Sequence, residues 1–532
     1  MSLANAALSA YGMLNPLFVV PCRVLVIKLD GGLYWHSILL IKICLIMKKI
    51  ALFISLLLLL LAGVLMYRAV TVFSDTQFQV TEALVPQELD ESQVVSRFSQ
   101  AIQIPTISYD DRSQFDHQAF SDFHAHLAKS FPLVSQYTQQ TRIADYSVVY
   151  HLVGQNTALK PALFMGHMDV VPIEEASLAD WQQEPFSGAV KDGVIWGRGT
   201  IDDKVSVLAL MESMELYLAQ GHQPQRSIYF AFGHDEEAGG DGAKAIAEHF
   251  AQQNIQFEFI LDEGGVVTDG IVPGAPQPVA LVGVAEKGFV NFHLSVKGEG
   301  GHSSQPPDHT AAGIIAQAVV DIENHPFTAK LDFFAMMFEK IGFAMPLNSR
   351  LPLANLWLLS PVVEQALLAK PSSAASMRTT TAVTMLQGSN KSNVLPTVAS
   401  AVVNFRILPG DTIASIRAHL IKVIDNPLVQ IEAHLANEAS ALSPTNALGF
   451  ELIESTIRRL DDNVLVSPYL VQGATDSRHF QALSKNIYRF MMVSLNPTTL
   501  KQFHGVNEQI SVKDYLQAIQ FYYAMVKQSA EG

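Results

Sequence analysis

Residues 161–169 read PALFMGHMD, an apolar run that ends on a histidine and an aspartate. Two later stretches repeat the pattern: residues 227–237 read SIYFAFGHDEE, and residues 257–265 read FEFILDEGG. Short apolar runs that close on polar residues are typical of buried strands in a sheet covered on both faces. Because ligands of such sheets collect at the carboxyl ends of the strands, these polar clusters mark a candidate site.

A helix is expected between the first two runs. Over residues 203–219, Val207, Met211, Met214 and Leu218 recur at helical spacing, which predicts a helix with one face toward the core. Strands that alternate with helices predict an α/β fold.

The pattern changes near Asn291. Residues 290–297 and 401–407 alternate apolar and polar side chains like half-buried strands, and a helix is expected over residues 311–322. We therefore predict an α+β domain over residues 290–410. It would interrupt a first domain formed by residues 86–289 and 411–528.

Composition excludes several classes of protein. The chain has 532 residues, of which 49% are hydrophobic and 16% charged, so a disordered chain is excluded and two domains are expected. A net charge of -15 argues against a nucleic-acid partner. Both cysteines, Cys22 and Cys44, lie near the N-terminus, so the predicted domains contain neither disulfides nor thiolate metal ligands.

The N-terminal region contains an uncharged stretch, residues 50–67, which as a helix would span roughly 27 Å. Lys48 and Lys49 precede it, so residues 47–70 are predicted to be a membrane anchor that leaves the body outside the cytoplasm, on the periplasmic or extracellular side. The alternative is a cleaved signal segment and a secreted protein, but residues 66–70 lack a small-residue cleavage site. Because Met47 with the lysine pair resembles a natural start, residues 1–46 are interpreted as an upstream extension.

The polar clusters together supply a distinctive set of side chains. Each alone has a simpler explanation: Asp202 and Asp203 could cap a helix, and Glu236 and Glu237 could lie in a solvated turn. Together they meet the needs of a hydrolytic two-metal site, namely imidazole and carboxylate ligands, a bridging carboxylate and a carboxylate base. The whole set is His167, Asp169, Asp202, Asp203, Glu236, Glu237, Asp262 and His504.

Four motifs resemble one known family, the dizinc carboxypeptidases and aminoacylases, which includes carboxypeptidase S, aminoacylase, carnosinase and glutamate carboxypeptidase. The motifs are GHMDVVP at 166–172, GRGTIDDK at 197–204, DEE at 235–237 and LDEG at 261–264. AIQIPT at 101–106 and FHGVNE at 503–508 resemble the carboxypeptidase S branch, which includes N-fatty-acyl-amino-acid hydrolases. The resemblance implies a catalytic domain with a mixed central sheet flanked by helices, interrupted by an α+β lid.

The resemblance also implies a ligand set for two zinc ions. His167 and Asp262 would bind one zinc, Glu237 and His504 the other, and Asp202 would bridge them, with a cis peptide bond to Asp203. Glu263 is the alternative to Asp262.

The resemblance assigns the remaining roles as well. Asp169 would orient His167, and Glu236 would act as general base. In the lid, His302 would stabilise the oxyanion, often in a partner subunit's site, while Asn393 and Arg406 would hold the substrate carboxylate. Arg478 is a further substrate-binding candidate. If the resemblance is set aside, the simpler interpretation of His302 is a surface histidine, and that of Arg406 is a strand arginine in a salt bridge at the rim.

The implied activity is hydrolysis of an amide bond next to a free carboxylate, in N-acyl amino acids or short peptides, by an enzyme that could form a homodimer through the lid. The alternatives are a general peptide carboxypeptidase and a catalytically inactive binding protein. Residues 333–363 are unusually apolar. They are expected to form helices that pack the lid core, or a channel for a long acyl chain.

Overall fold

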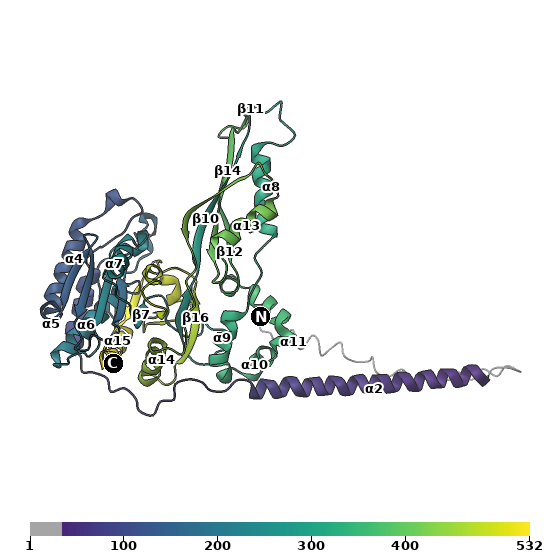
Figure 1. The fold of residues 1–532 in the computed structure, drawn as a ribbon, viewed down its shortest axis with the longest axis horizontal. Helices are drawn as coiled ribbons and strands as arrows, with labels where there is room; N and C mark the ends of the chain where they lie inside the picture. The colour runs from purple at the N-terminus through teal and green to yellow at the C-terminus, as the bar shows by residue number, and fades with distance from the viewer. Residues whose placement is uncertain (1–33, 532) are drawn as a thin grey trace. The chain divides into compact units, whose positions relative to one another are not determined.

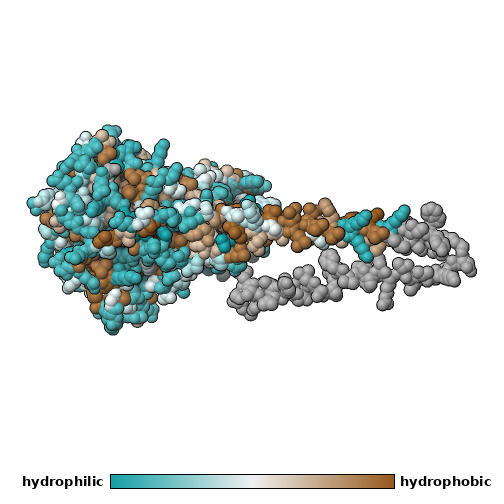
Figure 2. Space-filling model, turned by 90° about the horizontal axis from the view of Figure 1, so that it is seen from below, coloured by the Kyte–Doolittle hydropathy of each residue, from teal (hydrophilic) through white to brown (hydrophobic). Residues whose placement is uncertain are grey.

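The chain consists of two units, and a computed structural model describes residues 34–531 of them, with side chains from residue 42 onward. In the first unit the described part consists of residues 34–70, which belong to helix α2 (Tyr34–Thr71). Among the described residues, Lys42–Thr71 is the only unbent helix long and apolar enough to cross a membrane, and Figure 2 shows its hydrophobic surface. The predicted membrane segment lies in this helix. Residues 1–33 of the predicted upstream extension lie outside the described residues.

The second unit contains a sheet of ten strands (Figure 1). The strands are β1 (Gln139–Ile143), β2 (Ser147–Leu152), β3 (Ala162–His167), β6 (Ile228–Gly233), β7 (Phe259–Asp262), β8 (Val267–Thr268), β9 (Val279–Glu286), β16 (Leu465–Val471), β17 (Ile487–Arg489) and β18 (Ser494–Leu495). Their order is β1-β2-β6-β3-β7-β17-β9-β8-β18, and β16 pairs with β9. The sheet is mixed: β3 is parallel to β6 and β7, whereas β2 is antiparallel to β6. The three strands predicted from the sequence are β3, β6 and β7.

Helices cover both faces of this sheet. They are α3 (Glu91–Ile102), α4 (His117–Ser130), α5 (Pro132–Tyr137), α6 (Lys204–Ala219), α7 (Asp241–Gln252), α14 (Leu448–Leu460) and α15 (Val512–Glu531). Successive strand residues enter opposite cores, as the two-residue strand period requires. Phe164 joins the core that contains α6 and α15, and Leu163 and Met165 join the core that contains α7. The predicted α/β fold with a mixed central sheet flanked by helices is confirmed.

Helix α6 differs from its prediction. The sequence predicted one core-facing stripe, but residues 204–214 of α6 are buried on every side. The reason is that α6 lies between β3 and the C-terminal helix α15, so both of its faces contact protein.

The predicted lid contains a second, antiparallel sheet, which lies apart from the ten-stranded one in Figure 1. Its order is β12-β14-β10-β15, from β10 (Gly288–Lys297), β12 (Thr380–Gln387), β14 (Val398–Ile407) and β15 (Gln430–Asn437). Helices α8 (Ala311–Asn324) and α13 (Ile413–Ile424) share its core. The sheet thus continues past the expected boundary at residue 410, and we propose that the lid ends near residue 437.

The apolar segment 333–363 forms four short helices with the residues around it, namely α9 (Asp332–Ile341), α10 (Leu347–Leu353), α11 (Leu356–Leu368) and α12 (Pro371–Ala375). We call α9–α11 the helical insert. Met337, Phe338 and Ile341 of α9 pack with Leu465 of β16 and Leu281 of β9, at the ten-stranded sheet. The insert therefore covers that sheet, and none of its residues joins the core of the lid sheet.

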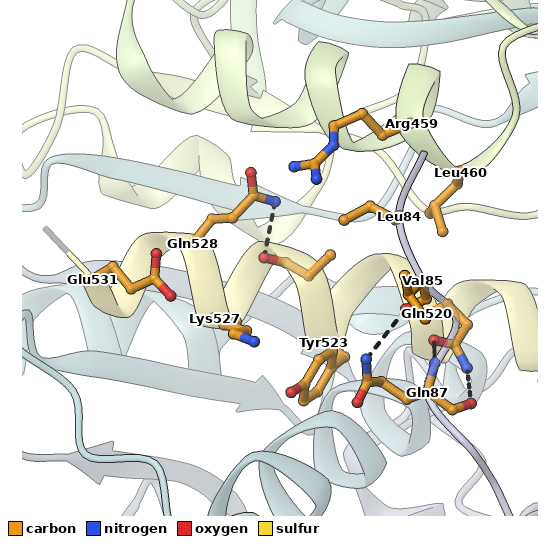
Figure 3. A pocket seen from close by; sticks show the side chains of 11 residues that line it. Leu84, Val85, Gln87, Arg459, Leu460, Gln520, Tyr523, Lys527, Gln528 and Glu531 are labelled. Carbon is orange, nitrogen blue, oxygen red and sulfur yellow. Dashed lines mark hydrogen bonds between the residues drawn. The ribbon is translucent and has the colours of Figure 1, made fainter. Parts of the chain in front are cut away.

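The segment that follows α2 runs along the second unit. Gln77 donates hydrogen bonds to the carbonyls of Val466 (2.9 Å) and Lys340 (3.0 Å). Further on, the backbone of Gln87 exchanges hydrogen bonds with the Gln520 side chain of α15 (Figure 3). Leu84 donates to the carbonyl of Arg459 at 2.9 Å. These contacts hold the segment against α14 and α15.

Candidate metal centre

The polar clusters converge because parallel strands end at the same edge of the sheet. β3 ends at His167, β7 ends at Asp262, and a 3-10 turn just after β6 carries Glu236 and Glu237. Asp202 precedes the first turn of α6, and His504 comes from the C-terminal part of the chain.

Asp202 lies between two histidines. Its Oδ1 is 2.9 Å from Nε2 of His167, and its Oδ2 is 2.8 Å from Nε2 of His504. Glu237 completes the group, since its Oε1 is 3.2 Å from the same His504 nitrogen. Ligand atoms of His167, Asp202 and Glu237 all lie within 4.8 Å of one another. One carboxylate that faces two imidazoles has the arrangement of a bridging ligand. The peptide bond between Asp202 and Asp203 is cis.

Asp169 organises the neighbouring groups. It is fully buried, and its Oδ1 is 3.3 Å from Nδ1 of His167. The same carboxylate accepts hydrogen bonds from the backbone N–H groups of Glu236 and Glu237, both at 3.1 Å. A single side chain therefore restrains both a predicted ligand and the turn that carries the predicted base. This is the contact expected of a residue that orients a metal-bound histidine.

Electrostatics favour a cation at this site. Burial raises the pKa of Glu236 well above its ordinary value and also raises the pKa of Glu237. Hydrogen bonds with Asp202 and Glu237 raise the pKa of His504 to about 10. Burial opposes ionisation of Asp202, but hydrogen bonds with His167 and His504 hold its pKa below the ordinary value. His167, Asp202 and Glu237 are largely buried, whereas the His504 side chain is 49% exposed. Zinc binds both carboxylates and imidazoles, so the donor set fits the predicted metal.

A cavity of about 410 Å³ opens beside this group. Its polar wall includes Asp202, Glu236, Glu237, Glu263 and His504. Its apolar wall consists of Val266, Tyr469, Val471, Leu495, Leu500 and Phe503. No residue of the apolar segment 333–363 lines it, so the described structure does not support an acyl channel made by that segment.

The two candidates for the fifth ligand are placed differently. Asp262 accepts hydrogen bonds from the N–H groups of Glu263 (3.0 Å) and Ser477 (2.8 Å), while Glu263 lines the cavity. Each oxygen of Asp262 keeps a second lone pair, so Asp262 stays the proposed ligand. Zinc content of Asp262→Asn compared with Glu263→Gln tests this choice, and loss of zinc only in Glu263→Gln would reverse it.

The predicted substrate-binding residues lie in two places. Arg478 is at the metal centre, where Nη1 is 3.4 Å from Oε1 of Glu236 and donates to the Thr475 carbonyl at 3.1 Å. His302 and Asn393 lie together on the lid, where Ser303 N–H donates to the Asn393 carbonyl and both side chains are exposed. Arg406 stacks over the ring of Phe289 at 4.9 Å. None of these three lid residues lines the cavity.

Glu508 is a site residue that sequence reasoning did not single out. It is fully buried and accepts hydrogen bonds from the N–H groups of Gly199 (3.0 Å), Ile201 (2.8 Å) and Asp202 (3.3 Å). It also forms a buried ion pair with Arg198. Glu508 thus holds the loop that presents Asp202. The motif FHGVNE contained it, but no local pattern indicated its partner, which lies 310 residues away.

We expect Glu508→Ala to lower the free energy of unfolding by about 3–5 kcal/mol, because Arg198 would keep a buried charge without its partner. Urea denaturation measures this loss. Glu508→Gln keeps an acceptor for the three N–H groups and is expected to lose less. A Glu508→Ala protein as stable as the parent would contradict the role.

The pattern of peptidase family M20/M25/M40 matches residues 163–528. The chain belongs to this family. Probable carboxypeptidase S-like 2 of Dictyostelium discoideum is 41% identical over 482 residues, which cover 88% of this chain and 92% of that protein. Human N-fatty-acyl-amino acid synthase/hydrolase PM20D1 is 36% identical over 434 residues, which cover 80% of this chain and 86% of that protein.

Solved structures of the M20 family share the fold. An M20 family metallo-carboxypeptidase from Sulfolobus solfataricus has a TM-score of 0.60 at 16% identity and covers 83% of this chain and 100% of its own. The suspected family and branch are therefore confirmed, and the chain is an enzyme of a metal-dependent peptidase family.

Proposed function

We propose that this M20 enzyme hydrolyses an amide bond next to a free carboxylate and releases an amino acid from N-acyl amino acids or short peptides. The observation that carries the proposal is Asp202, whose two oxygens face His167 and His504 beside Glu237. Retention of every predicted ligand and of Glu236 argues against an inactive binding protein.

The residues divide the chemistry among them. Two zinc ions, one held by His167 and Asp262 and the other by Glu237 and His504 with Asp202 shared, would polarise the scissile carbonyl and favour ionisation of water. Glu236 accepts a proton from the attacking water on its carboxylate and delivers it to the leaving nitrogen.

Positioning falls to the side chains around Glu236. Asp169 accepts a hydrogen bond from the backbone N–H of Glu236, and the Arg478 guanidinium lies against the Glu236 carboxylate. The base is therefore held from two sides. Arg478 keeps its proposed second role at the substrate carboxylate, which a guanidinium can bind through both oxygens. His302, Asn393 and Arg406 would meet the substrate from the lid.

The apolar wall of the cavity favours a fatty acyl group over a peptide. Val266, Val471 and Leu495 lie in the same cavity as the metal centre. Each buried methylene contributes about 0.8 kcal/mol, so a long chain gains affinity that an acetyl group lacks. A relative named an N-fatty-acyl-amino acid synthase/hydrolase supports this substrate class. A relative named a carboxypeptidase supports the second candidate, cleavage of peptides.

A substrate panel separates the two candidates. With the amino acid held constant, we expect kcat/KM for N-oleoyl substrates to exceed that for N-acetyl substrates by about 100-fold or more, since burial of several methylenes suffices. The assay uses the zinc-supplied enzyme, with zinc content measured in parallel and dipeptides included. Equal kcat/KM for all acyl lengths would reject the fatty-acyl preference, and faster dipeptide cleavage would favour the carboxypeptidase.

We also propose that α2 anchors the enzyme with its body on the periplasmic or extracellular side. Lys48 and Lys49 precede the apolar stretch, and positive flanks stay in the cytoplasm. Digestion of the body by protease added to sealed cells from which any outer membrane has been removed tests the side. N-terminal sequencing of the mature protein tests the alternative, cleavage and secretion.

A homodimer through the lid is proposed on separate grounds. His302 and Asn393 are exposed together on the lid and do not line this chain's cavity, so a second subunit's site is where they could act. Mixing His302→Ala with Glu236→Gln protein should restore part of the activity if each dimer then contains one complete site. No restoration would contradict shared sites.

A further inference from the structure

Helices α10 and α11 of the insert present apolar side chains to solvent. Leu347 is 40% exposed, Trp357 61%, Leu358 41% and Val362 61%. Between residues 347 and 368 the only charged residues are Arg350 and Glu364. Single apolar side chains on a surface are ordinary, but a group this sparse in charge is typical of an interaction site.

These side chains follow the period of the helix. Trp357, Leu358, Pro361 and Val362 of α11 recur at helical spacing and are all exposed, whereas Val363 on the other side is buried. Contact with the ten-stranded sheet comes instead from Met337, Phe338 and Ile341 of α9. The exposed face of α11 is therefore an outer surface, and it does not line the metal-centre cavity.

The insert is tied to the chain just after the candidate membrane span. Phe73 packs so closely on Gly342 that a Cβ there would lie 2.7 Å from its ring. Beside it, Lys340 donates hydrogen bonds to the Thr76 carbonyl (3.3 Å) and to Glu454 of α14 (3.0 Å). Residues 73–77 are thus fixed to α9 and to the turn after it.

Chain length then limits how far the insert can lie from a bilayer crossed by α2. The uncharged stretch ends at Tyr67, and residues 68–72 separate it from Phe73. Phe73 is therefore six residue steps from Tyr67, and six steps span at most about 20–22 Å when fully extended. This limit holds for any orientation of α2.

We propose that the exposed face of α10 and α11 is a lipid-binding surface that inserts into the headgroup region of the bilayer crossed by α2. Trp357 suits that depth, because its ring is apolar and its N–H can bond to headgroups or water. The net charge of -15 provides no general attraction to anionic lipid, so the apolar side chains drive the contact. The inference rests on α2 as a membrane span and not on the proposed reaction.

The test places an environment-sensitive dye on this face in the full-length protein. In a chain with Cys22→Ser and Cys44→Ser, Val362→Cys is labelled with a nitrobenzoxadiazole dye, and the protein is reconstituted in phosphatidylcholine vesicles. Val320→Cys is the matched control, since Val320 is also a valine, 48% exposed, on helix α8 of the lid. We expect the dye at position 362 to shift to the blue and to be quenched several-fold by lipids with nitroxide on the acyl chain, with neither change at position 320.

Two outcomes of this experiment would overturn the proposal. Equal emission and quenching at positions 362 and 320 would show that the face stays in water. Efficient disulfide cross-linking of unlabelled Val362→Cys between two copies would assign the face to self-association instead. As an independent measurement, Trp357→Gln with Val362→Gln should reduce hydrolysis of N-oleoyl substrate in vesicles several-fold but leave that of a water-soluble N-acetyl substrate unchanged. If the dye shifts but neither substrate is cleaved, the lipid surface stands and the proposed function fails.

Discussion

Glu236→Gln is expected to lower kcat by about 10²- to 10⁴-fold, the usual contribution of a general base. The glutamine keeps the size of the side chain but cannot accept the proton from water. Its backbone N–H still reaches Asp169, so the turn that carries the neighbouring ligand Glu237 should persist. We therefore expect zinc content and KM to change little.

Steady-state kinetics and zinc analysis by mass spectrometry check this prediction together. Glu248→Gln, an exposed position on α7, is the matched control and should behave as the parent. If Glu236→Gln hydrolyses substrate as fast as the parent, the base is another residue. If zinc is lost as well, Glu236 is a ligand.

Asp202→Asn is expected to abolish measurable hydrolysis and to release at least one of two zinc ions. The neutral amide cannot place one anionic oxygen toward His167 and another toward His504, which is the arrangement the carboxylate has. In the parent, a chelator should remove activity and added zinc should restore it. Added zinc should not give the Asp202→Asn variant measurable activity.

Thermal unfolding supplies a second measurement for Asp202. Zinc should raise the melting temperature of the parent, because a ligand that binds only the folded state stabilises that state. Zinc should raise the melting temperature of Asp202→Asn by a smaller amount. Asp192→Asn is the control, since Asp192 is exposed and its φ of 53° suits asparagine. Equal zinc stoichiometry in Asp202→Asn and the parent would refute the shared ligand.

The strands that carry the site could be predicted within a residue or two. The apolar run within residues 161–169 is β3 at Ala162–His167, and the run within residues 227–237 is β6 at Ile228–Gly233. These strands are buried on both faces, so their side chains must be apolar until the chain leaves the sheet. That local requirement makes both the strand and its polar end readable from the residues.

The environment of the helices could not be predicted in the same way. The expected stripe of α6 is only part of what is buried, because α15 covers its other face, and nothing near residues 204–219 indicates a helix at 512–531. For the same reason, the apolar segment 333–363 indicated helices but not that α9 would pack against β16.

The sequence by itself determined the fold class, the family and the residue types of the metal centre, because strand burial and ligand chemistry act on neighbouring residues. Only the tertiary structure decided that Asp202 lies between His167 and His504, that Glu508 holds the loop before it, and that α11 faces outward. The longest of those contacts join residues 302 and 307 positions apart, and their geometry depends on how the whole sheet and its covering helices pack.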